Sequence, residues 1–242
     1  MNCKKCNNPL EERKNFCPQC GTGVIFKRID WHFIFDEIKQ IFNLEKGIFF
    51  TIRELITQPG NAVRTYIEGD RQRMVKPIFF LFATAITYVF IGEWFHVELF
   101  QKSGPEMPEF NEGMNWISSN MAYVYLLLSL IYSLWSRLLF WKQPYNIVEI
   151  FVFNCYTSGL VMVSTSIILI FQVILKFDFN TNSIIASVVT CIYHAWAMTL
   201  FFNGNKFVIV LKSAAVILLS MFTIFFVALI ILIAYLVLSN LL

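Results

Sequence analysis

The sequence predicts an all-α, polytopic membrane protein: a bundle of about five transmembrane helices with a small four-cysteine zinc ribbon at its amino terminus. Three observations predict this class. The 242-residue chain is 57% hydrophobic and 14% charged, whereas an average soluble domain is about half apolar and a quarter charged. Five apolar runs approach the roughly 20 residues that cross a bilayer as a helix. The first twenty residues carry two Cys-x2-Cys pairs.

The paired cysteines predict a structural zinc site within residues 1–26. Two such pairs, separated by ten residues, supply the four thiolates that Zn²⁺ prefers in a tetrahedral shell; they are Cys3, Cys6, Cys17 and Cys20. A unit this short takes most of its folding energy from the metal. Four thiolates leave no open position for a catalytic water. A redox Cys-x-x-Cys pair and an iron-sulfur cluster are the alternatives for the same residues.

The next region, residues 27–76, predicts short amphipathic helices rather than membrane spans. Apolar residues recur at helical spacing over residues 30–42, 48–57 and 62–68. Pro59 and Gly60 predict a turn between the second and third of these helices. Two placements are open for the helices. They lie in the inner membrane interface with their aromatic rings at the acyl boundary, or they pack on the cytoplasmic ends of the bundle.

A basic collar before the first span predicts the orientation of the chain. Positive residues beside a first span are held in the cytoplasm, and the collar consists of Arg64, Arg71, Arg73 and Lys76. The transmembrane bundle, residues 77–242, is predicted to cross at residues 77–95, 117–136, 150–175, 183–202 and 213–238. Residues 96–116 form an irregular outer loop in this prediction. The amino terminus is then cytoplasmic and the carboxyl terminus lies outside.

The third apolar run is longer than one crossing requires. It begins at Tyr145 and ends at Leu175, which is about 46 Å of helix at 1.5 Å per residue, against a hydrocarbon core of about 30 Å. Either one helix is steeply tilted, or the first part lies along the inner surface and only residues 157–175 cross.

One intramembrane polar group is a candidate for function. His194 falls near the middle of the fourth span, where a titratable group is energetically costly and marks a functional site by default. Glu149, near the inner end of the third apolar run, and Asn154 would reach His194 if those helices touch. The competing interpretation is a polar bond that locks helices together. Known enzyme signatures are missing from the sequence, and a membrane enzyme would have only His194, Glu149 and Cys155 as reagents.

Several segments resemble one family. ITQPG at residues 56–60, YIEG at 66–69, the basic residues after it and KPIF at 76–79 resemble the signature of a bacterial family of uncharacterised membrane proteins, the DUF3667 family. Its members commonly begin with a ribbon that Cys3, Cys6, Cys17, Pro18, Cys20 and Gly21 match. A second patch, at residues 145–153, resembles another family element, although Ile150 stands where a histidine is usual. The resemblance implies a fold and a bacterial inner membrane, but no activity.

These observations predict a non-enzymatic membrane protein whose zinc head recruits or senses a protein partner. The expected partners are the lipid bilayer, that protein and a second copy of the chain. Nucleic acid is not expected, because only Phe16 accompanies the basic residues of the head, Lys4, Lys5, Arg13 and Lys14. The alternative is a small transporter, channel or permease with His194 and Glu149 in its pathway.

Overall fold

The computed structural model describes residues 47–71, 73–97 and 108–239, with four isolated positions nearer the amino terminus. The chain divides into two compact units, residues 1–42 and 43–242, and all the described helices belong to the second. Apart from Cys6, the cysteines of the predicted ribbon lie outside the described residues, as does the predicted helix at 30–42. The division of the chain at residues 26 and 76 stays a prediction.

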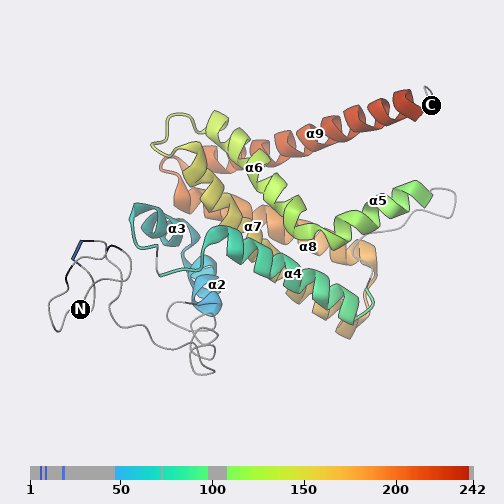
Figure 1. Ribbon diagram of the computed structural model, residues 1–242, viewed down its shortest axis with the longest axis horizontal. Coiled ribbons are helices and arrows are strands. Elements are labelled where there is room, and N and C mark those ends of the chain that lie inside the picture. Colours follow the sequence, from blue (N-terminus) through green and yellow to red (C-terminus); the bar gives the residue numbers. More distant parts are fainter. Residues whose placement is uncertain are drawn as a thin grey trace. The chain divides into compact units, whose positions relative to one another are not determined.

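The second unit is helical, and its described residues contain no strand (Figure 1). The short helices are α2 (Ile48–Thr57), α3 (Pro59–Glu68) and α5 (Pro108–Ser119). The long helices are α4 (Pro77–Trp94), α6 (Met121–Leu139), α7 (Ile147–Leu175), α8 (Phe179–Phe201) and α9 (Lys206–Ser239). These five are the helices of the described residues that are long and apolar enough to cross a membrane. This confirms the prediction of an all-α protein, and the number of candidate spans agrees with the five predicted.

The predicted spans match the first four long helices to within four residues at each end, but the fifth begins seven residues earlier, at Lys206. In the sequence, the charges of Lys206 and Lys212 favoured a loop before the fifth span. In the structure the Lys212 ammonium donates to the Leu139 carbonyl at 2.7 Å and lies 5.1 Å from the Phe140 ring centroid. Because the end of α6 satisfies this charge, α9 can begin before its apolar run.

The predicted irregular loop at residues 96–116 is wrong over its second half, which forms α5. Pro108 stands at the first helical position, where its missing amide costs nothing and its fixed φ favours the helix. Phe110, Met114 and Ile117 recur at helical spacing in the sequence. The glycines and prolines around this pattern obscured it.

Helix α7 is the centre of the unit. It packs against α2, α3, α4, α6 and α8, and every residue from Phe153 to Met162 is buried. Its first turn is fixed by a capping box: the Asn146 side chain accepts from the Glu149 amide, and the Glu149 carboxylate accepts from the Asn146 amide. The helix is unbroken over 29 residues. Of the two predicted arrangements, the structure therefore favours a single long helix.

Helix α2 packs against α7, and α3 packs against both α7 and α8. We call the pair α2 and α3 the platform. Leu55 and Val63 are fully buried there, which favours packing on the bundle over lying in the interface. Pro59 and Gly60 do not form the predicted turn, because Pro59 begins α3. A Cβ at Gly60 would lie 2.2 Å from the Leu200 carbonyl carbon of α8, so this glycine permits close contact between the two helices.

An aromatic cluster closes the bundle at the platform end. Phe140 and Phe202 stack with ring centroids 4.0 Å apart, and Phe201 stacks on both Phe153 at 4.3 Å and Tyr145 at 4.4 Å. These rings come from the ends of α6 and α8 and from the start of α7. Such contacts contribute about 0.5–1.5 kcal/mol each beyond the burial of their area. The platform end is therefore a densely packed part of the unit.

Candidate functional site

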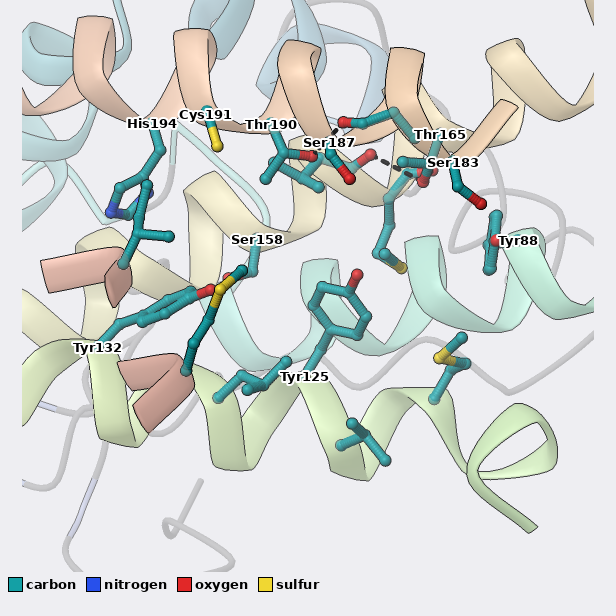
Figure 2. Close-up of a pocket in the computed structure, with 18 of the residues that line it drawn as sticks. Tyr88, Tyr125, Tyr132, Ser158, Thr165, Ser183, Ser187, Thr190, Cys191 and His194 are labelled. Atoms are coloured by element: carbon teal, nitrogen blue, oxygen red, sulfur yellow. Dashed lines mark hydrogen bonds between the residues drawn. The ribbon is translucent and has the colours of Figure 1, made fainter. Parts of the chain in front are cut away.

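A cavity of about 480 Å³ lies between α6 and α8. These two helices each pack on α7 and α9, and the cavity occupies the space between them (Figure 2). Helix α4 contributes Tyr88, and α9 contributes Ile217, Met221 and Ile224. The volume falls within the range of about 300–1,000 Å³ that is typical of small-molecule sites.

One face of α8 forms the polar wall of the cavity. The lining residues recur every fourth residue in adjacent pairs, which places them on one helix face; they are Asn182, Ser183, Ala186, Ser187, Thr190, Cys191 and His194. Figure 2 shows the labelled members of this row along one helix, opposite Tyr125 and Tyr132 of α6. The small side chains of this face leave room for the cavity. A larger side chain at any of these positions would partly fill it.

The opposite wall combines tyrosines with aliphatic side chains. Tyr125 and Tyr132 alternate along α6 with Met121, Val124 and Leu128, and α7 adds Val161 and Met162. The hydroxyls of Tyr88, Tyr125 and Tyr132 donate no hydrogen bond to any described residue, whereas those of Tyr156 and Tyr193, outside the cavity, each donate to a carbonyl. The described lining contains no Asp, Glu, Lys or Arg. The wall is thus amphipathic and uncharged.

His194 lies at the end of the cavity nearest the platform. Its side chain is 5% exposed, and Nε2 has no hydrogen-bond partner among the described residues. The ring centroid lies 5.5 Å from that of Tyr132. Asn182, twelve residues earlier on the same face, is 9% exposed and its Oδ1 is likewise without a partner in the described part of the chain. Two buried polar atoms therefore mark the two ends of the cavity.

The structure does not bring the other two members of the predicted polar site to His194. Glu149 caps the start of α7, and Asn154 donates to Ser133 of α6 at 3.0 Å. Neither residue lines the cavity. Asn154 instead belongs to a hydrogen-bonded seam between α6 and α7, in which Ser129 and Ser158 also bond at 3.2 Å. Asn154 therefore links two helices by a hydrogen bond, which is the competing interpretation given in the sequence analysis.

The basic collar takes part in holding the platform. The Arg64 guanidinium donates to the Phe201 carbonyl, with Nε at 3.1 Å, and to the Asn203 side chain at 3.2 Å. Arg73 pairs with Glu54 of α2 at 3.5 Å and lies over the Phe50 ring. Arg71 and Lys76 are exposed. The orienting role of all four stays a prediction, and the contact between Arg64 and the end of α8 was not predicted from the sequence.

The described residues offer no metal site. None of them forms a group of three or more His, Cys, Asp or Glu side chains that could hold a metal ion. The predicted ligands Cys3, Cys17 and Cys20 lie outside that part of the chain. The zinc site therefore stays a prediction.

The segment that includes the platform and most of α4 is also the part of the chain that matches a known family. Residues 45–89 match DUF3667, a family described as a protein of unknown function. Over these residues, the match confirms the resemblance that the sequence showed. No curated protein and no solved structure matches the chain. The platform is therefore a feature of the matched segment, whereas most of the cavity lining comes from residues after it.

Proposed function

We propose that the chain is a non-enzymatic membrane protein that recruits or senses a protein partner through a zinc-bound cytoplasmic head. Four thiolates of the head, Cys3, Cys6, Cys17 and Cys20, hold the metal in a structural role. The collar keeps the head on the cytoplasmic side of a bacterial inner membrane. The carboxyl terminus then lies outside.

The observation that supports this proposal is the set of hydrogen bonds between the platform and the bundle. The Tyr193 hydroxyl donates to the Leu55 carbonyl at 3.2 Å, and the Tyr156 hydroxyl donates to the Val75 carbonyl at 2.6 Å. The Val75 amide in turn donates to the Thr51 hydroxyl at 3.1 Å. These hydrogen bonds join the platform, which follows the head in the chain, to α7 and α8. In this proposal, a partner held by the head acts on the bundle through the platform.

The test is affinity capture of the full-length protein from native membranes. The variant Cys3→Ser/Cys6→Ser removes half of the metal shell, and Cys191→Ser is the control, because it removes a thiol outside the head. We expect about one zinc per chain in the control and loss of both zinc and the captured partner in the double variant. The same partners with both proteins would contradict the proposal.

A second candidate is a small transporter, channel or permease, and the uncharged cavity that ends at His194 favours it. In this structure the aromatic cluster fills the platform end of the bundle, and Glu149 lies outside the cavity. A pathway would therefore use His194 without Glu149 and would require the rings of Phe201 and Phe202 to move. Flux into reconstituted vesicles that is unaffected by His194→Ala would remove this path assignment.

Self-association is a further part of the proposal. Apolar side chains in the middle of α9 are exposed in the single chain, among them Leu218, Phe222 and Phe225. Either lipid or a second copy would cover them. Crosslinking in native membranes, followed by separation by mass, distinguishes a homo-oligomer from a monomer.

A further inference from the structure

The cavity between α6 and α8 contains more hydrogen-bonding groups than its own walls pair. His194 Nε2 is buried without a partner in the described residues. The hydroxyls of Tyr88, Tyr125 and Tyr132 also line the cavity, and no described residue pairs with them. A polar group in an apolar surrounding is costly to leave without a hydrogen bond. An occupant with polar atoms would relieve this cost.

The walls exclude a charged occupant. No acidic or basic side chain of the described residues lines the cavity, so an ion would enter a low-dielectric space without a counterion. The available groups are hydroxyls, one amide and an imidazole, which recognise uncharged oxygen-bearing groups. The occupant therefore carries a neutral polar group.

The shape of the cavity suits a chain. From Asn182 to His194 the α8 wall advances about 18 Å at 1.5 Å rise per residue, and the volume of about 480 Å³ far exceeds the roughly 30 Å³ of one water molecule. Val124, Leu128 and Val161 supply hydrocarbon contact along this length. An extended molecule with both polar and apolar parts fits such walls.

The cavity is accessible from the hydrocarbon side of the bundle. Cys191 of α8 and Met221 of α9 line it and are also exposed, and their neighbours Ile192 and Phe222 are exposed as well. In a membrane this surface faces acyl chains. Beyond His194, at the platform end, the stacked rings fill the bundle. A lipid-soluble molecule can therefore enter the cavity from the hydrocarbon side, whereas entry from the platform end would require the stacked rings to move.

We infer that this cavity is a binding site for an uncharged single-chain lipid, whose oxygen-bearing head lies at His194 and Tyr132 and whose hydrocarbon chain extends along the apolar wall formed by Leu128, Val124 and Val161. A long-chain alcohol, a monoacylglycerol and a quinone share this chemistry. The inference does not depend on the zinc head. A lipid bound in this cavity would be the ligand of a sensor or the substrate of a transporter.

The test uses the full-length protein in phosphatidylcholine vesicles and a hexadecanol that carries a photoreactive diazirine. We expect saturable crosslinks concentrated on the lining faces of α6 and α8, located by mass spectrometry of the peptides. Unlabelled hexadecanol should compete, whereas palmitate under alkaline conditions, which has a charged head on a similar chain, should not. Competition by a monoacylglycerol or by a quinone then shows which of these classes of neutral lipid the site prefers.

Variants separate binding in the cavity from ordinary lipid contact. His194→Leu removes the buried imidazole and should weaken competition by hexadecanol about tenfold. Thr190→Trp should fill the cavity and abolish the saturable labelling. Ile192→Leu, on the exposed face of α8, should change nothing. Melting curves identify any variant that fails to fold, and Tyr132→Phe, a smaller change, replaces His194→Leu in that case.

Three outcomes would overturn the inference. Labelling that spreads evenly over the lipid-facing helices, with no saturation, is the result expected of a cavity filled with water. Equal competition by palmitate would show that the site does not select an uncharged head. Undiminished saturable labelling of a folded Thr190→Trp variant would place the lipid somewhere other than the cavity.

Discussion

The platform end of the bundle and the cavity between α6 and α8 use the same residue type in different ways. At the platform end, Tyr156 and Tyr193 each donate a hydrogen bond to a carbonyl of another segment. Along the cavity, Tyr88, Tyr125 and Tyr132 donate none to the described residues. The first group stabilises the fold, whereas the second is available to a ligand. Polar residues in a membrane bundle therefore differ in role according to whether the fold already pairs them.

The largest effect should come from Gly60→Ala at the platform end. A Cβ at this position would lie 2.2 Å from the backbone of Leu200, so α3 and α8 would have to separate. We expect a loss of about 3 kcal/mol, the upper part of the range for overpacking, measured as the melting temperature of the detergent-solubilised protein.

Gly113→Ala is the matched control for this change. It lies in α5, and no described atom lies within 4 Å of a Cβ added at this position. Alanine in a helix interior is favoured over glycine by about 0.5–1 kcal/mol, so this variant should melt at the same or a higher temperature. Equal losses in both variants would show that the contact between α3 and α8 is not tight.

The next effect should come from Arg64→Leu, which removes the guanidinium from the end of α8. The lost hydrogen bonds reach the Phe201 carbonyl and the Asn203 side chain, and a charged donor contributes about 1.5–3 kcal/mol. We expect a loss of about 2 kcal/mol in the same melting assay. Arg64→Lys should recover only part of it, because an ammonium does not reproduce the planar geometry of the guanidinium.

Arg71→Leu controls for the loss of a positive charge from the collar. Arg71 is exposed, so its removal should leave the melting temperature nearly unchanged. A loss as large as that of Arg64→Leu would assign the effect to collar charge rather than to the contact with α8.

The sequence predicted local structure better than it predicted contacts between helices. The bounds of α2 were predicted without error, because its apolar face and the preceding Gly47 are local signals. Gly60 was assigned to a turn, since a Pro-Gly pair usually marks one, but its role depends on the backbone of Leu200, far away in the sequence. Glu149 was placed in a pathway because it lies in an apolar run, whereas its partner is the local cap residue Asn146.

The candidate site was only partly predictable. The depth of His194 in an apolar run identified it, and the recurrence of small polar residues before it on α8 was visible in the sequence. The cavity itself was not predictable, because it depends on α6 and α8 both packing on α7 and α9, which leaves a space between them. The tyrosines on α6 gave no signal of their own, since tyrosine in a span is common at either kind of position.

A smaller effect should separate the two groups of tyrosines directly. Tyr156→Phe and Tyr193→Phe each remove one hydrogen bond between segments, so each should cost about 1 kcal/mol. Tyr132→Phe, in the cavity, removes a hydroxyl that no described residue pairs and should change the stability by less than about 0.5 kcal/mol. Melting in lipid-free detergent measures all three. A cost for Tyr132→Phe equal to the other two would mean that its hydroxyl already has a structural partner.

The smallest effect concerns Asp178, which caps the start of α8 outside the spans. Its carboxylate accepts from the Thr181 hydroxyl and from the Asn180 and Thr181 amides, and these bonds, that of the Thr181 side chain first, lower the pKa of Asp178 below its ordinary value. A lowered pKa in the folded state means that the stabilisation is present at neutral pH and is lost as the pH falls below about 4. Asp178→Asn keeps a capping oxygen without the titration, so its melting temperature should depend less on pH between about 5 and 3 than that of the unchanged protein. Because Asp178 is exposed, this difference in melting temperature should be the smallest of the effects described. Identical pH profiles for the two proteins would show that the Asp178 carboxylate does not contribute to the stability of the fold.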